Sequence, residues 1–222
     1  MENGCFAQQA SAVGCIGGGG FAVGVILLFT LSAGQAASPP SVTEFQLHPN
    51  AKFLPCLQAN GKMATAKVRV VRGPLNDELV IKLDGFKPNL AFDLFTVQRS
   101  SLLSNGKPDP GFKGRFGLAW YQTDLQVDGH GDGSAVIHTI LLDQIFGFDP
   151  DVSLPPTNTF HVGFWFNDPS DAAPCGFTGS TPFNGEHHAG PLAFISLPNA
   201  ITNLGPLCIK PNTSTTPARC NP

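Results

Sequence analysis

The sequence predicts an all-β protein whose main part is a single antiparallel β-sandwich, with jelly-roll and Ig-like topologies both open. About eight short, β-rich runs are separated by turn residues, and the 222-residue chain contains 25 Gly and 20 Pro. No amphipathic helix recurs between these runs, which argues against a parallel α/β sheet. Hydrophobic residues make up 42% of the chain and charged residues only 13%, which argues against disorder and against a coiled coil.

The N-terminal 37 residues differ in composition from the rest. They contain one charged residue, Glu2, and an apolar stretch over residues 15–33. Small residues follow, which predicts a secretory signal peptide cleaved near Ala36 or Ala37. Because no Lys or Arg precedes the apolar stretch, a retained membrane anchor and a buried core helix are the alternatives.

This N-terminal segment of 37 residues, the leader, sets the predicted division of the chain. We expect a signal peptide or membrane-anchor helix over residues 1–37 and a linker with the first strand over residues 38–61. The β-sandwich domain follows over residues 62–200, and an irregular tail rich in Cys and Pro occupies residues 201–222. The part after the leader is long enough to bury a full core as one domain.

The predicted strands are short runs with period-two character. In residues 78–84, Leu79, Ile81 and Leu83 share one face while charged side chains occupy the other, which indicates a half-solvated antiparallel strand. A long loop is expected over residues 100–114 and one or two helical turns over residues 141–148. The strands are expected at residues 67–72, 78–84, 91–98, 115–121, 125–127, 134–140, 159–166 and 192–196.

Four cysteines follow the leader: Cys56, Cys175, Cys208 and Cys220. In an exported chain they predict one or two disulfides, for which three pairings exist. Cys208 and Cys220 flank a Pro/Thr/Ser tail that a bridge between them would tie down, and Cys56–Cys175 would then be a long-range bridge. Buried free thiols are the alternative.

Four stretches together resemble a functionally uncharacterised family of exported bacterial all-β proteins. They are residues 91–98, residues 116–122 followed by Asp128-Gly-His-Gly, residues 160–167 and residues 181–190. The resemblance covers roughly residues 62–197 and implies an extracellular β domain. It transfers no functional residue.

A Gly-rich turn over residues 128–133 is one candidate metal site. Asp128, His130 and Asp132 stand at alternate positions, as oxygen ligands do in calcium loops. A histidine in the middle position suits calcium poorly, and Thr139 stands where such a loop has its Glu. A polar hairpin turn is the alternative, because Gly and Asp tolerate positive φ.

A second candidate metal site lies in residues 184–190. Glu186, His187 and His188 offer a carboxylate and two imidazoles, and His161 is a further ligand that a β fold could bring close. Adjacent histidines on an extended chain point to opposite faces, so one of the pair would bind. A solvated loop is the alternative. A divalent metal at this loop or turn is the one cofactor that the sequence suggests.

Aromatic side chains supply a third candidate site. Trp120, Tyr121 and Trp165 could form a stacking platform for sugars. Aromatic residues at alternate positions of a strand are also typical of a core, which is the expectation for Phe164 and Phe166.

These observations favour an exported, non-catalytic binding or structural module of the cell envelope or extracellular space. The sequence contains no Gly-x-Ser-x-Gly elbow of a hydrolase, no phosphate-binding loop beside a strand and no Cys-x-x-Cys redox motif. The net charge of −3 does not indicate the basic surface that nucleic-acid binding requires. The expected partner is an extracellular ligand or an envelope component, with membrane contact only through an uncleaved leader. The alternatives are a metal-binding protein or metalloenzyme and a carbohydrate-binding module.

Overall fold

The computed structural model describes residues 42–59, 61–73, 76–139, 159–179 and 189–208. All of them belong to one unit of the chain, Gln35–Pro222. The predicted signal or anchor helix and the predicted helical turns at residues 141–148 lie outside the described residues. Among the helices within them, none has the length and apolar character needed to cross a membrane.

Nine strands and three short helices make up the described fold. The helices are η1 (Ala51–Phe53), α1 (Leu54–Leu57) and η2 (Pro169–Cys175). The strands are β1 (Val42–Pro49), β2 (Thr65–Val71), β3 (Asp77–Asp84), β4 (Ala91–Val97), β5 (Ala119–Gln126), β6 (Gly133–Thr139), β7 (Thr159–Phe166), β8 (Leu192–Ser196) and β9 (Leu207–Cys208).

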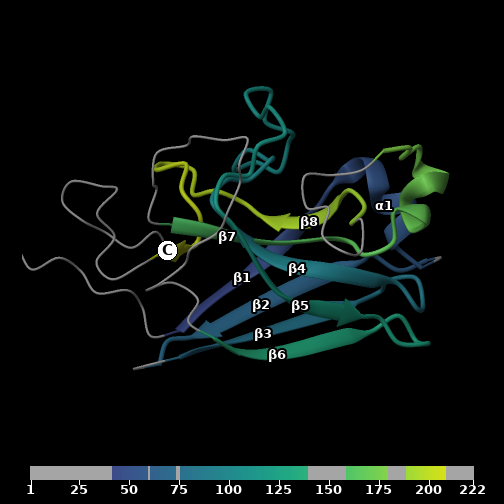
Figure 1. Ribbon diagram of the computed structural model, residues 1–222, viewed down its shortest axis with the longest axis horizontal. Helices are drawn as coiled ribbons and strands as arrows, with labels where there is room; N and C mark the ends of the chain where they lie inside the picture. Colours follow the sequence, from purple (N-terminus) through teal and green to yellow (C-terminus); the bar gives the residue numbers. More distant parts are fainter. Residues whose placement is uncertain (1–41, 60, 74–75, 140–158, 180–188, 209–222) are drawn as a thin grey trace, which may run out of the picture. The chain divides into compact units, whose positions relative to one another are not determined.

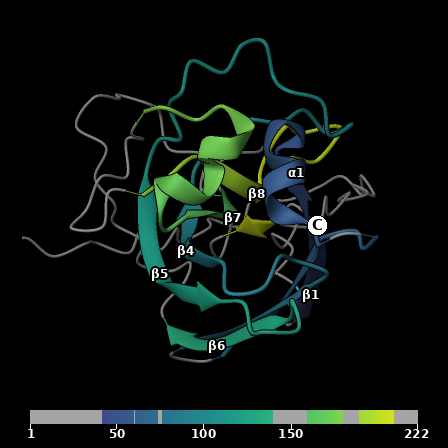
Figure 2. The same cartoon turned by 90° about the vertical axis from the view of Figure 1, so that its right-hand side faces the viewer.

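The strands form one antiparallel sheet, which confirms the predicted all-β class. The order is β5-β4-β7-β8-β1-β2-β3-β6, and β9 pairs with β7. The sheet is strongly curled and nearly barrel-shaped: seen from its end, β7 and β8 lie opposite β6, and β1 lies opposite β5 (Figure 2). The expected sandwich would have two separate sheets, whereas β1 here pairs with both β2 and β8 and joins the two halves.

The interior of the curled sheet is the main hydrophobic core. Leu79, Ile81 and Leu83 of β3 are buried there and Lys82 is exposed, which confirms the predicted alternation. Phe164 and Phe194, on the neighbouring strands β7 and β8, stack with ring centroids 5.2 Å apart. Such aromatic pairs add stability beyond the apolar area that they bury.

Two local predictions need correction. Residues 115–121 and 125–127 were expected as two strands, but β5 is one strand, Ala119–Gln126. A register shift opposite Leu94 and Phe95 places one extra residue in β5, so the ladder continues through the irregularity. The tail was expected to be irregular, but Leu207 and Cys208 pair with Phe160 and Thr159 of β7.

A disulfide closes one end of the sheet. Cys56 of α1 bonds to Cys175 of η2, 119 residues later in the sequence, with the two Cα atoms 6.1 Å apart. α1 and η2 lie side by side at this end in Figure 2. The predicted Cys56–Cys175 bridge is therefore present, while Cys220 lies outside the described residues.

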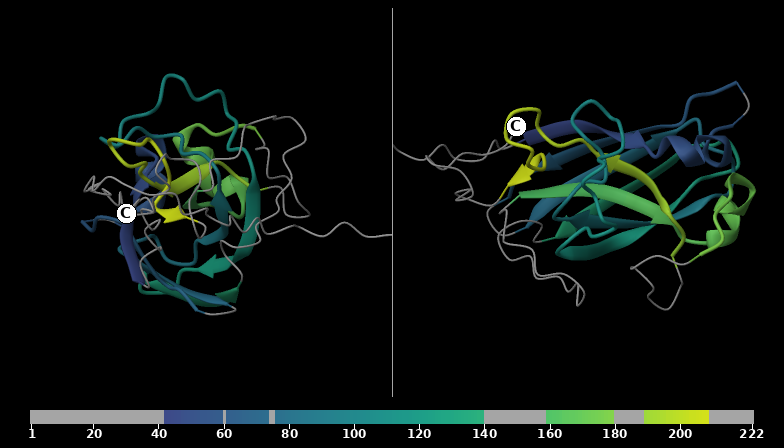
Figure 3. Two further views of the ribbon diagram at one scale, coloured as in Figure 1. Left: turned by 90° about the vertical axis from the view of Figure 1, so that its left-hand side faces the viewer. Right: turned by 90° about the horizontal axis from the view of Figure 1, so that it is seen from above.

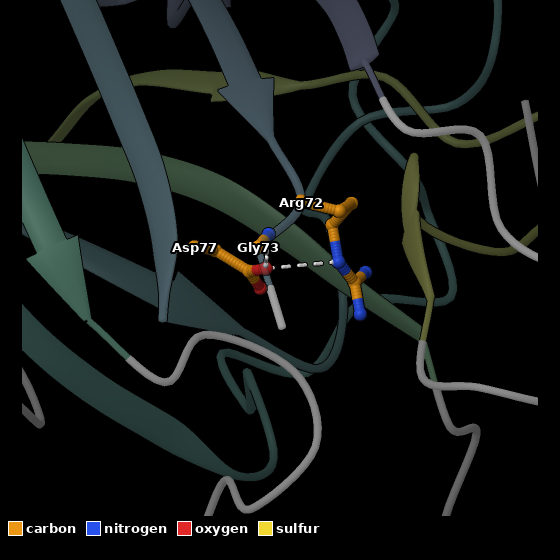
Figure 4. A network of polar contacts seen from close by, with 3 residues as sticks. All are labelled: Arg72, Gly73 and Asp77. Carbon is orange, nitrogen blue, oxygen red and sulfur yellow. Dashed lines mark hydrogen bonds and ion pairs between the residues drawn. The ribbon is translucent and has the colours of Figure 1, made fainter. Parts of the chain in front are cut away.

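A buried ion pair ties the ends of β2 and β3 together (Figure 4). The Nε atom of Arg72 lies 3.1 Å from Oδ1 of Asp77, and the two side chains are only 4% and 8% exposed. The same carboxylate oxygen accepts a hydrogen bond from the backbone N–H of Gly73. Since removing one partner would leave a buried charge uncompensated, this pair fixes the hairpin ends.

Candidate functional site

A second hydrophobic cluster lies on the outer face of β4, β7 and β8. Its centre is Trp165, only 1% exposed, which contacts Phe95 and Phe116 edge to face at centroid distances of 5.4 and 5.1 Å. The long segment of residues 98–118 passes over this face, drawn in teal above β7 and β8 (Figure 1). β7 is consequently buried on both of its faces.

Backbone hydrogen bonds hold this covering segment, residues 98–118, in place. The N–H of Gln98 donates to the carbonyl of Leu118 and the N–H of Arg99 to that of Phe116, at 2.8 and 2.9 Å. Further along, the N–H of Asp109 donates to the carbonyl of Ser101 at 2.9 Å. The side chains of the segment are therefore held at defined positions relative to β7.

A compact turn over residues 198–205 lies beside the covering segment (Figure 3). Oδ1 of Asn199 accepts hydrogen bonds from the backbone N–H groups of Ile201 and Thr202, at 2.9 and 3.1 Å. The next residue, Asn203, has a left-handed φ of 58°, a conformation that Asn tolerates better than most residues. Because this network is local, the turn presents Thr202 and Asn203 in a fixed orientation.

A cavity of about 330 Å³ separates the covering segment from the turn. Its base includes His161 of β7, which is 2% exposed. The polar side chains that line it include Arg99, Ser100 and Asp109 from the covering segment and Thr202 and Asn203 from the turn. Leu102, Leu204 and Pro198 contribute apolar wall. This volume suits a small molecule rather than a polymer.

The hydrogen bonds of His161 define its protonation. Nδ1 lies 3.0 Å from the carbonyl oxygen of Ser196 and 3.0 Å from its Oγ. Because a carbonyl oxygen can only accept, we assign the proton to Nδ1, which leaves Nε2 as an acceptor. Burial, only partly offset by the hydrogen bond to the Ser196 carbonyl, lowers the pKa of His161 to about 4. The imidazole is therefore neutral at physiological pH.

The cavity also contains one charge of each sign. Arg99 and Asp109 are both half-buried and both line it. Oδ1 of Asp109 accepts a hydrogen bond from the N–H of Gly111 at 2.7 Å, which fixes the carboxylate. The ion pairs among the described residues do not join Arg99 to Asp109. A ligand in the cavity could therefore interact with Arg99 through one group and with Asp109 through another.

The Gly-rich turn over residues 128–133 is a hydrogen-bonded hairpin turn. Oδ1 of Asp128 accepts the backbone N–H groups of His130 and Asp132, at 2.8 and 3.0 Å. These hydrogen bonds, with the one from Asp132 largest, lower the pKa of the fully exposed Asp128. The alternative of a polar turn thus accounts for these three residues.

The other candidate metal ligands are only partly described. Glu186, His187 and His188 lie outside the described residues, and His161 is in the cavity. Within the described ranges, no three His, Cys, Asp or Glu side chains lie close enough together to hold a metal ion. The metal site at residues 184–190 remains a prediction.

The three candidate aromatic residues do not share a surface. Trp165 is buried in the outer cluster, where Phe95 also packs. Tyr121 contacts Phe95 at 5.5 Å and is 48% exposed. Trp120 precedes Tyr121 in β5, and its side chain points to the opposite face because neighbours in a strand alternate. A flat platform of all three rings is excluded by this arrangement.

Sequence reasoning missed Arg99, Asp109 and Asn203 as site residues. They lie on two loops, and only the fold brings them beside His161. The one signal was the polar loop of residues 100–114, whose length is unusual for a connection within a small β domain. Comparisons with protein-family models, with curated proteins and with solved structures found no match to this chain.

Proposed function

We propose that the protein is an exported, non-catalytic binding module that holds a small polar ligand in the cavity beside His161. The observation that carries this proposal is a cavity with a buried, oriented imidazole at its base and charged groups on its walls. Pockets that combine apolar walls with a few fixed polar groups are the usual form of small-ligand sites.

The protonation of the lining groups favours binding over catalysis. The titratable side chains among the described lining residues are Arg99, Asp109 and His161. Arg remains protonated at all relevant pH values, and a histidine with a pKa of about 4 is a weak base near neutrality. Neither Arg99 nor His161 is therefore suited to move a proton during a reaction at physiological pH.

Two observations support export. The apolar N-terminal segment has the composition of a secretory signal or an anchor. The Cys56–Cys175 disulfide is the kind of long-range bridge that persists in oxidising compartments. We therefore propose that the module works in the extracellular space or on the cell surface, with an extracellular small molecule as its partner.

A blocked cavity tests the proposal. Thr202 is exposed at the cavity, so Thr202→Trp should fill the opening without disturbing the core. Thr178→Trp is the matched control, because Thr178 is also exposed but does not line the cavity. In ligand-observed NMR with a set of small acids, amides and sugars, hits should bind the native protein and the control but not Thr202→Trp. Hits that persist in Thr202→Trp would refute the cavity as the site.

A further inference from the structure

Arg99 is the main clue to the chemistry of the ligand. This residue is half-buried and lines the cavity, and no carboxylate among the described residues forms an ion pair with it. Arg72, whose side chain is buried, does have such a carboxylate in Asp77. A guanidinium presents a planar fork of donors that matches a carboxylate in two parallel hydrogen bonds. The cavity thus supplies a guanidinium, and a ligand could supply the carboxylate that pairs with it.

Asp109 and His161 restrict what else the ligand carries. Both offer acceptors, the Asp109 carboxylate and the Nε2 atom of neutral His161. A ligand that pairs with Arg99 through a carboxylate can satisfy these acceptors if a hydroxyl or ammonium group next to the carboxylate donates hydrogen bonds to them. A second anionic group would instead be repelled by Asp109.

The size and walls of the cavity suit a small ligand. Its volume of about 330 Å³ is at the small end of ligand pockets. The apolar wall at Leu102 and Leu204 can cover a short carbon skeleton, while the amide of Asn203 lies on the exposed side. These walls suit a molecule of a few carbon atoms up to one sugar ring.

We propose that the ligand is a small organic carboxylate with a hydroxyl or amino donor beside the acid group. The carboxylate lies on Arg99, and the neighbouring donor reaches Asp109 or His161. This inference rests on the proposed function, because it assigns the ligand class of the same cavity. It covers hydroxy acids, amino acids and acidic sugars, which share this chemistry and differ in the second group.

Matched acid and neutral probes distinguish hydroxy acids, amino acids and acidic sugars as ligands. The isotope-labelled full-length protein is titrated with L-lactate, L-alanine and D-glucuronate, and with their neutral counterparts L-lactamide, L-alaninamide capped at its amine, and D-glucose. Backbone and side-chain NMR shifts of Arg99, Thr202 and Asn203 report on the cavity. At least one acid should shift these signals in a saturable way, and its neutral counterpart should bind about tenfold more weakly or worse.

Two arginine variants provide the control. Arg99→Gln keeps a long polar side chain but removes the charge, and it should weaken the acid about tenfold or more. Arg115→Gln removes one positive charge from an exposed position in the same segment, outside the cavity lining, and should bind as the native protein does. The comparison separates a specific pair from a general effect of net charge.

Each outcome decides a different claim. If the neutral probes shift the cavity signals as strongly as the acids, or if Arg99→Gln binds the acids normally, the carboxylate class is overturned while the cavity remains a binding site. If neither set shifts these signals at tens of millimolar, the ligand class and the proposed function both fail.

Discussion

The Cys56–Cys175 disulfide offers the most quantitative test of the fold. The bridge spans 119 residues of sequence, which contain β2 to β7. Cross-linking a loop of that length removes conformational entropy from the unfolded chain worth about 5 kcal/mol at 25 °C. Because small proteins are stable by only about 5–15 kcal/mol, this bridge carries a large part of the unfolding free energy.

The double variant Cys56→Ala/Cys175→Ala removes the bridge without leaving a free thiol from this pair. We expect it to lose about 3–5 kcal/mol in urea unfolding and about 6–20 °C in melting temperature. Reduction of the native protein should produce a similar loss, and it serves as the control because it leaves both side chains in place. A loss below about 1 kcal/mol in the double variant, or full stability of the reduced native protein, would refute this reasoning.

The remaining predictions concern buried polar groups and close backbone contacts. Asp77→Ala removes the carboxylate that pairs with the buried Arg72 side chain and should cost about 3–5 kcal/mol in urea unfolding; an unchanged midpoint would contradict a buried pair. The pKa of His161 is lowered to about 4, so between that pH and about 6.5 the unfolded state binds the proton and acid destabilises the fold. Between pH 7 and pH 4, the free energy of unfolding should therefore fall by about 3 kcal/mol more in the native protein than in His161→Gln. Identical pH profiles of the two proteins would contradict the lowered pKa of His161. A Cβ atom at Gly205 would lie 2.3 Å from the carbonyl oxygen of Phe160, so Gly205→Ala should cost about 1–3 kcal/mol, whereas Gly179→Ala, with open space around it, should be neutral in a thermal melt.

Local patterns predicted most of the strands. In β3, the alternation of Leu79, Ile81 and Leu83 with charged residues identified both the strand and its buried face, because the side chains of a strand alternate. Cys56–Cys175 was one of the pairings that the four cysteines left open, and the structure contains it.

The joining of the two halves into one sheet could not be predicted in the same way. It depends on β1 pairing with β8, a contact between residues about 150 positions apart that leaves no local pattern. Trp165 shows the same limit. The sequence made it a candidate for an exposed stacking platform, but a polar segment from elsewhere in the chain covers its face of the sheet. The cavity combines both effects, because Arg99, His161 and Asn203 come from distant parts of the sequence and line one cavity only in the folded protein.

Binding of a small carboxylate in the cavity beside His161 is open to direct observation. A crystal structure of the protein soaked with L-lactate, the smallest of the proposed hydroxy-acid probes, tests this most directly. We expect lactate in the cavity, with its carboxylate hydrogen-bonded to the guanidinium of Arg99 and its hydroxyl directed to Asp109 or to Nε2 of His161. An empty cavity, or lactate bound elsewhere such as at the exposed ring of Tyr121, would contradict it.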